Sequence, residues 1–264
     1  FEMVRLRVIE RPEFSSPEAV VYEAPKLEAA NFETTAPEEA QAPVDGIAHS
    51  AVTEALADVP FTHLHVHSQF SVLQAVSPVG ELVAAAKEMG MPALAVTDHG
   101  NMMAAFQFVR ACNKEGIKPI VGAELNVCRD MHDKSVKDDG YPTVFLAKNK
   151  NGYHNLAKLA SKAYTDGFYY VPRIDRALVE EYKEDMIVLT GGLFGEVPSL
   201  ILNVGEAQAE EAFLFWKNLM GADFYAEVNR HGLEEETVVN DVLKGLAATH
   251  DVKLVASNNS YYTR

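Results

Sequence analysis

The stretch from residue 93 to residue 127 decides the fold, and it reads ALAVTDHGNMMAAFQFVRACNKEGIKPIVGAELNV. It opens with a short apolar run, Ala93 to Thr97, and closes with a longer one, Lys118 to Val127; both are typical of buried strands. Residues 103–115 between them have helical periodicity, and Gly116 is placed to end that helix. A strand, a helix and a second strand in this order predict a parallel pair joined by a crossover.

The same pairing of apolar runs with helical segments continues on both sides of this unit. Further helices are expected at residues 77–90, with Ser77 as N-cap and Pro78 as the first helical residue, and at 151–166, 207–220 and 234–250. Seven strands suit a closed barrel with a parallel sheet better than an open sheet, and a doubly wound fold stays open as the alternative. The other expected strands are Thr62 to Val66, Thr143 to Ala147, Met186 to Leu189, Phe224 to Val228 and Leu254 to Ser257.

Residues 1–60 differ in composition from the rest of the chain. They hold 12 acidic and 4 basic side chains and six of the 12 prolines, with few large apolar residues. Such a segment buries too little apolar surface to offset the entropy of ordering. We expect an acidic, largely irregular leader or linker here, with a short strand at residues 4–9, followed by one domain at residues 61–264.

Charge and composition exclude several classes of protein. The formal net charge of -15 argues against a stand-alone domain that grips nucleic acid, because phosphate binding requires a basic face. No run of about 18 apolar residues and no secretory signal is present, so we expect a cytoplasmic protein without a membrane span. Cys112 and Cys128 are too few for a disulfide framework and are expected to be reduced, buried thiols.

A histidine cluster stands on the first expected strand. His63, His65 and His67 alternate with Leu64 and Val66, so on a strand the three imidazoles would share one face and the two apolar side chains the other. A single histidine is more often a hydrogen-bonded structural residue than a ligand. Three imidazoles on one face nevertheless need polar or metallic partners, because an unpartnered buried polar group is costly. We therefore favour a ligand role for the cluster.

Polar residues also follow or interrupt four other expected strands. Asp98 and His99 follow the second, Glu124 interrupts the third, residues 229–231 follow the sixth and residues 257–259 follow the seventh. Residues 98–101 alone would equally fit a turn with a helix N-cap. Polar groups at the ends of successive strands are typical of the functional mouth of a barrel. Imidazoles with a carboxylate at this mouth favour zinc, manganese or iron and metal-assisted phosphoester hydrolysis.

Five ordered motifs between residues 61 and 264 carry a family resemblance. They are His63-Leu64-His65-Val66-His67-Ser68, Thr97-Asp98-His99-Gly100-Asn101, the segment Gly116 to Glu124, Gly152-Tyr153-His154-Asn155-Leu156 and Leu254-Val255-Ala256-Ser257-Asn258. Together they resemble the amino-terminal PHP (polymerase and histidinol phosphatase) domain of the bacterial DNA polymerase III alpha subunit. The resemblance implies a distorted (β/α)7 barrel within a DNA-directed DNA polymerase, a nucleotidyltransferase of DNA replication. The polymerase carboxylates would lie beyond Arg264, so this chain by itself is not expected to synthesise DNA.

The resemblance also implies a ligand set, because metal-binding members of this family hold a trinuclear centre with nine ligands. Four positions match: His65, His67, His99 and Glu124. The other five carry residues that do not replace the expected acid, imidazole or thiol: Gln74, Pro142, Gly192, Asn259 and Tyr261. The four matching residues therefore form a vestigial metal site, with no catalytic residue and no required cofactor. At most one weakly bound divalent ion, zinc or manganese, is expected there.

These losses lead to two hypotheses of different classes. The first is a catalytically inactive PHP domain that serves as a structural and docking module for a separate proofreading exonuclease and for the remaining polymerase domains. DNA would then be held only through the full-length polymerase. The second is an active metal-dependent 3′-5′ exonuclease or phosphoesterase. A free-standing histidinol-phosphate phosphatase is disfavoured by the same ligand losses.

Overall fold

The computed structural model describes residues 61–263. The acidic leader at residues 1–60 and the strand expected at residues 4–9 lie outside the described residues. Within residues 61–263, no helix is long and apolar enough to cross a membrane.

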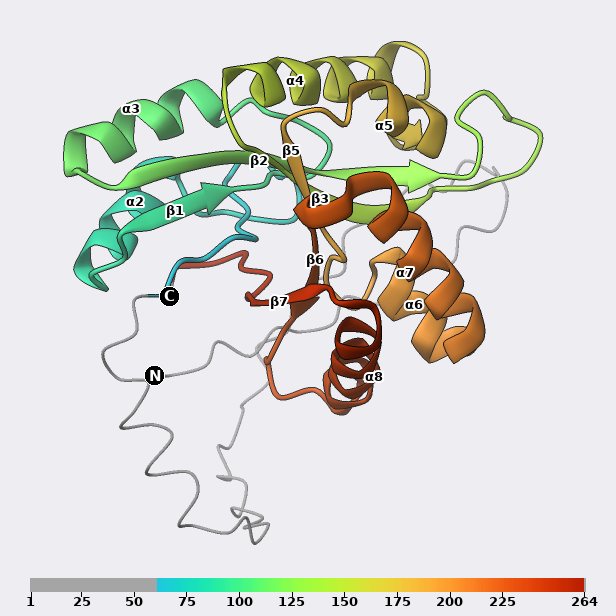
Figure 1. The fold of residues 1–264 in the computed structure, drawn as a ribbon. Helices are drawn as coiled ribbons and strands as arrows, with labels where there is room; N and C mark the ends of the chain where they lie inside the picture. Colours follow the sequence, from blue (N-terminus) through green and yellow to red (C-terminus); the bar gives the residue numbers. More distant parts are fainter. Residues whose placement is uncertain (1–60, 264) are drawn as a thin grey trace, which may run out of the picture. The chain divides into compact units, whose positions relative to one another are not determined.

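A seven-stranded sheet forms the centre of the described chain (Figure 1). The order along the sheet is β1-β2-β3-β5-β6-β7, and β4 pairs with β2. Six of these strands were expected, and β4 was missed because it has only 3 residues. The predicted barrel-type α/β fold is confirmed. The strands are β1 (Ala93–Val96), β2 (Lys118–Cys128), β3 (Tyr141–Ala147), β4 (Arg173–Asp175), β5 (Met186–Leu189), β6 (Phe224–Val228) and β7 (Lys253–Ala256).

The expectation of a parallel sheet is wrong at β3. This strand runs antiparallel to both neighbours, β2 and β5, whereas the other pairs of strands are parallel. The reason lies in the connection from β2 to β3, because residues 129–140 contain no helix. Without a helical crossover the chain turns back on itself, and the two strands pair in opposite directions.

Seven α-helices and one short 3-10 helix, Gly221–Asp223, accompany the sheet within residues 61–263. In Figure 1, α3, α4 and α5 lie along one side of β2, whereas α6, α7 and α8 gather near β6. Gly116 ends α3 as expected, in the left-handed conformation with φ of 75°. The expected N-cap at Ser77 is wrong, because α2 begins at Val79 and Pro78 occupies the N-cap position. The helices are α2 (Val79–Glu88), α3 (Ala105–Glu115), α4 (Lys150–Thr165), α5 (Arg176–Tyr182), α6 (Glu196–Asn203), α7 (Glu206–Met220) and α8 (Glu234–His250).

Residues 63–67 close the sheet between β1 and the chain that follows β7, although they do not form the strand expected there. The amides of Ala95 and Thr97 donate to carbonyls of this segment at 3.0 and 2.8 Å. On its other side the segment exchanges two backbone hydrogen bonds with Ser260, at 2.8 and 3.1 Å. Figure 1 shows the corresponding blue and red segments side by side. The barrel is thus completed by an irregular segment that carries the histidines.

The apolar core lies on both faces of the sheet. Ala95, Val144, Leu146 and Leu189 form an apolar floor inside the barrel. The opposite faces of the strands pack under the helices, where a larger cluster includes Phe145 of β3. The functional side chains described next stand above this floor, where the strands end.

Candidate metal centre

Two carboxylates project into the barrel interior above the apolar floor. Glu124 on β2 is paired in register with Val144 on β3, and Glu227 on β6 is paired with Val255 on β7. Both valines pack with the interior cluster. Because directly opposite residues share a face of a sheet, Glu124 and Glu227 face the same interior surface.

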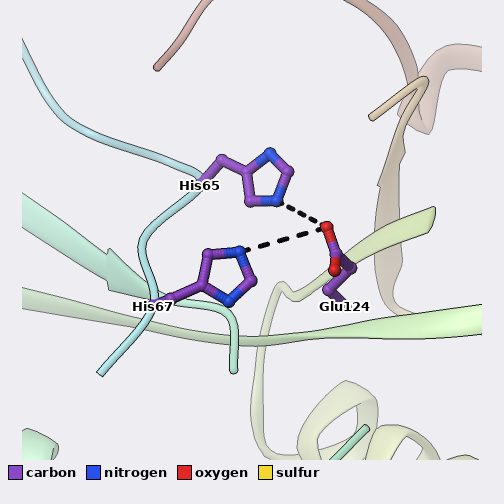
Figure 2. A group of neighbouring side chains, drawn as sticks. All are labelled: His65, His67 and Glu124. Atoms are coloured by element: carbon purple, nitrogen blue, oxygen red, sulfur yellow. Dashed lines mark hydrogen bonds and ion pairs between the residues drawn. The ribbon is translucent and has the colours of Figure 1, made fainter. Parts of the chain in front are cut away.

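His65, His67 and Glu124 form a compact group at this mouth (Figure 2). One ligand atom from each lies within 4.8 Å of the others. His65 Nε2 is 2.9 Å from Glu124 Oε2, and His67 Nε2 is 4.0 Å from the same oxygen. Two imidazole nitrogens and a carboxylate oxygen are donors that a divalent metal ion accepts. The described chain therefore contains a possible site for a metal ion.

His65 contacts a carboxylate through each of its ring nitrogens. Nδ1 lies 3.0 Å from Glu227 Oε1, while Nε2 faces Glu124. Burial by itself lowers the pKa of His65, but the two glutamates outweigh it and raise that pKa to about 10. Burial likewise opposes the charge on Glu124, yet hydrogen bonds with His65 and His99 hold the pKa of this carboxyl well below its usual range. His65 is therefore an imidazolium that bridges two carboxylates.

His67 has a different environment, although it is only two residues away. Its Nδ1 lies 2.9 Å from Ser71 Oγ, whereas its buried Nε2 has no hydrogen-bond partner among residues 61–263. Burial lowers the pKa of His67 to about 3, so the ring is neutral. One face of the ring stacks on Tyr261, with ring centres 4.3 Å apart and planes 2° apart. A buried nitrogen without a partner calls for a ligand, and this atom is the best indication of one in the mouth.

His99 and Asp98 have separate roles. His99 Nδ1 lies 2.8 Å from Glu124 Oε1, so this histidine supports the carboxylate from the β1 side. Asp98 instead accepts hydrogen bonds from the amide and hydroxyl of Ser68 and from the hydroxyl of Ser71, at 2.7, 2.7 and 2.8 Å. Asp98 therefore fixes the turn at residues 68–71, a role that its own position after the second expected strand did not indicate.

His63 does not share the surface of the other two imidazoles, so the expected three-histidine face is wrong. Its ring packs edge-on against Phe61, with ring centres 4.9 Å apart. The alternation fails because Leu64 packs on the floor of the barrel, whereas Val66 packs in the cluster under α2 and α3. The segment twists between these two residues, which period-two reasoning does not anticipate.

Sequence reasoning missed Glu227. The signal was present, because this acid interrupts the apolar run 224–228 and stands two residues before Asn229. His231, which follows the same strand, pairs instead through Nδ1 with Glu236 in the first turn of α8.

The side of the mouth at the ends of β6 and β7 carries amides and hydroxyls. Within residues 61–263, buried side-chain oxygens of Asn229, Ser257 and Asn259 have no hydrogen-bond partner. A Cβ added at Gly192 would lie 3.6 Å from Asn259 Nδ2 and 3.7 Å from Asn229 Nδ2, so Gly192 borders the same space. Asn259 Nδ2 also donates to the Tyr261 hydroxyl at 3.3 Å. Gly192, Asn259 and Tyr261, three of the five substituted positions, thus adjoin one another beside the histidines.

The remaining two substituted positions supply no anionic ligand either. Pro142 contributes only its backbone carbonyl, which would lie 3.0 Å from a Cβ added at Gly191. Gln74 is exposed in the turn after Ser71. Clustered divalent cations need several anionic ligands to balance their mutual repulsion. A metal ion binds a neutral imidazole, so an ion held by His65, His67 and Glu124 would take the place of the hydrogen on His65 Nε2. The residues at the mouth fit one such ion, and they do not fit three.

Comparison with known proteins identifies close sequence relatives. The PHP domain family matches residues 63–231. The DNA polymerase III alpha subunit of Treponema pallidum is 42% identical to this chain over an alignment that covers 78% of it. The corresponding subunits of Borreliella burgdorferi and Aquifex aeolicus are each 39% identical, over 76% of this chain. The chain spans 18% of the length of each of these relatives.

Solved structures with similar folds are more distant in sequence. A Bifidobacterium adolescentis protein, proposed to be a metal-dependent phosphoesterase, is 12% identical with a TM-score of 0.54 over 78% of this chain and 89% of that one. An amidohydrolase from Chromobacterium violaceum is 12% identical with a TM-score of 0.50 over 76% and 87%. These likenesses show the fold alone. From the match over residues 63–231, the chain belongs to the PHP domain family.

Proposed function

We propose that the chain is the PHP domain of a replicative DNA polymerase III alpha subunit and that this domain no longer hydrolyses phosphoesters. The observation that carries the proposal is the composition of the β6–β7 side of the mouth. Asn229, Ser257 and Asn259 present neutral groups there, and Gly192 offers no side-chain ligand. The one carboxylate on β6, Glu227, is already paired with His65. Without further anions, a second and third divalent cation have no charge balance, so the hydrolytic centre of the family does not assemble.

In place of catalysis, we propose a structural and docking role. The domain would support the remaining polymerase domains of its own subunit in the cytoplasm and bind a separate proofreading exonuclease. The similarity to three polymerase III alpha subunits supports the polymerase assignment. The net charge of -15 suits a protein partner better than DNA, which would be held elsewhere in the subunit.

One experiment on the purified chain tests the loss of catalysis. Metal content is measured after loading with Zn²⁺ or Mn²⁺, and hydrolysis of single-stranded DNA and of a chromogenic phosphodiester is followed in the same samples. We expect at most one ion per chain and no hydrolysis above an EDTA-treated blank. Three ions per chain with EDTA-sensitive hydrolysis would overturn the proposal.

The docking role has its own test in the full-length subunit. Size-exclusion chromatography with the proofreading exonuclease of the same organism should give a stable complex, and deletion of residues 61–264 should abolish it. A complex that survives this deletion would place the exonuclease on another domain.

The alternative function is a metal-dependent 3′-5′ exonuclease or phosphoesterase, and one observation favours it. The buried, unpartnered Nε2 of His67 beside Glu124 is retained, as expected of a working ligand position. Hydrolysis with one bound ion would support this alternative, and loss of that hydrolysis in Glu124→Gln would assign it to this mouth.

A further inference from the structure

We propose that Ser71 is a positioning residue that sets the tautomer of His67. It holds the ring hydrogen on Nδ1 and thereby presents Nε2 as a bare electron pair to the mouth of the barrel. This inference goes beyond the proposed function, because it concerns the state of His67 whether or not the domain docks a partner.

Ser71 is fully buried, and its Oγ takes part in several hydrogen bonds. A hydroxyl has one hydrogen to donate and two electron pairs that accept. Three groups surround this oxygen: Asp98 Oδ1 at 2.8 Å, the amide nitrogen of His99 at 3.0 Å and His67 Nδ1 at 2.9 Å. The role of Ser71 toward each group therefore follows from the roles of the other two.

Two of these roles are fixed by chemistry. The amide of His99 can only donate, so it takes one electron pair of Ser71 Oγ. Asp98 Oδ1 already accepts the amide hydrogen of Ser68 at 2.7 Å, which marks it as an acceptor. The single hydrogen of the Ser71 hydroxyl therefore goes to Asp98. One electron pair is left on Ser71 Oγ, and His67 Nδ1 must donate to it.

The hydrogen on His67 Nδ1 determines the state of the other ring nitrogen, Nε2. A neutral imidazole carries one hydrogen, so a hydrogen on Nδ1 leaves Nε2 with a free electron pair. Within the part of the chain that the structure describes, that Nε2 is buried beside the Asn259 side chain, makes no hydrogen bond of normal geometry, and lies 4.0 Å from Glu124 Oε2. The hydrogen bond with Ser71 thus leaves His67 Nε2 with the free electron pair that a metal ligand needs.

His65 shows that this state does not follow from burial alone. It is as fully buried as His67, yet both of its nitrogens face carboxylate oxygens. The difference between the two rings is the partner of Nδ1, which is a carboxylate for His65 and a saturated hydroxyl for His67. Orientation of a metal-binding histidine by the partner of its second nitrogen is a general feature of metal sites.

The first experiment reads the tautomer directly. The EDTA-treated 264-residue chain is labelled with [15N]histidine, and two-bond 15N–1H correlation spectra are recorded at neutral pH. His67 should show a protonated Nδ1 and an unprotonated Nε2. In Ser71→Ala we expect the hydrogen to move to Nε2, where Glu124 can accept it. A wild-type spectrum with the hydrogen on Nε2 would overturn the proposal, and it needs no variant to fold.

The second experiment measures Zn²⁺ affinity by competition with a chromophoric chelator. Ser71→Ala should weaken binding by roughly 10-fold or more, the usual range when the partner of a ligating histidine is lost. Ser68→Ala is the matched control, because it removes the other hydroxyl that donates to Asp98 without touching His67. The control should keep both the His67 tautomer and the Zn²⁺ affinity. An unchanged tautomer and affinity in Ser71→Ala would refute the positioning role, and neither readout depends on hydrolysis or docking.

Discussion

On the β1–β2 side of the barrel mouth, His65, His67 and His99 converge on Glu124, whereas the β6–β7 side presents Asn229, Ser257 and Asn259 to the same interior. Both sides are buried and polar, and they differ in charge. The first side pairs cationic and neutral imidazoles with a carboxylate, and the second contributes no anion beyond Glu227, which contacts His65. Buried polar groups therefore do not by themselves make a metal centre, because the number of anions limits how many cations the site can hold.

Removing the anion at the centre of the histidine side should have the largest effect. Glu124→Gln keeps the size of the side chain but leaves the imidazolium of His65 with Glu227 as its only carboxylate contact among residues 61–263. Breaking a buried charge pair costs about 3–5 kcal/mol. Urea unfolding should show a loss in this range, and Zn²⁺ binding should disappear.

The control for this prediction is a histidine–glutamate pair outside the mouth. His250 Nε2 lies 2.6 Å from Glu210 Oε1, whose side chain is 43% exposed. Because water screens such a pair, Glu210→Gln should cost less than about 1 kcal/mol and leave Zn²⁺ binding unchanged. Equal losses in the two variants would mean that Glu124 has no special electrostatic role.

The histidine side was largely visible in the sequence. Glu124 stood out as a lone acid in an apolar strand, and the interpretation of His65 and His67 as neighbours required only that they lie close in sequence. The exclusion of His63 was not predictable from period two, because it depends on a twist that sends Leu64 and Val66 to opposite sides of the sheet. Short-range patterns fix spacing, whereas tertiary packing decides which face each residue takes.

The fold shows the same division. Strands β1, β2, β5 and β6 were predicted close to their observed bounds because each is a continuous, largely apolar run. The antiparallel direction of β3 was not predicted, because we assumed that a helix connects every pair of successive strands. The connection from β2 to β3 contains none. The short helix α6 was missed as well, since its 8 residues follow directly on a glycine-rich turn and contain Pro198.

Introducing an acid and an imidazole on the amide side should have the next largest effect. The double variant Asn259→Asp, Tyr261→His replaces two neighbouring side chains beside His67. In EDTA we expect a loss of about 1–3 kcal/mol, because a new buried carboxylate lacks a counter-charge. With Mn²⁺ or Zn²⁺ in excess, metal content should rise above that of the wild type and stability should recover.

Asn203→Asp serves as the control for this double variant, because it makes the same amide-to-acid change at an exposed position in α6. It should leave metal content unchanged and cost at most about 1 kcal/mol of stability, because its amide donates only exposed hydrogen bonds to Ser199. If the double variant binds no additional metal, the lack of anions is not the reason that the β6–β7 side of the mouth binds no cation.

A smaller effect is expected from the hydroxyl of Tyr261. Tyr261→Phe keeps the ring that stacks on His67 and removes only the acceptor of the hydrogen bond from Asn259 Nδ2. Such a bond contributes about 0.5–1.5 kcal/mol, so thermal unfolding should shift by a few degrees. Tyr262→Phe, at a neighbouring exposed ring, should leave the midpoint unchanged. An unchanged midpoint in Tyr261→Phe would show that the stack, and not the amide contact, holds the segment after β7.

The smallest effect should come from a methyl group at Gly192. An added Cβ meets the side-chain nitrogens of Asn259 and Asn229 at 3.6 and 3.7 Å, which are ordinary contact distances. Gly192→Ala should therefore change the free energy of unfolding by no more than about 0.5 kcal/mol. At Gly191 the same change should cost about 1–2 kcal/mol, because its φ of 79° is left-handed and a Cβ would lie 3.0 Å from the Pro142 carbonyl. A Gly192→Ala variant as unstable as Gly191→Ala would show that the amide side is closed by packing. Absence of charge would then not be the reason that it holds no cation.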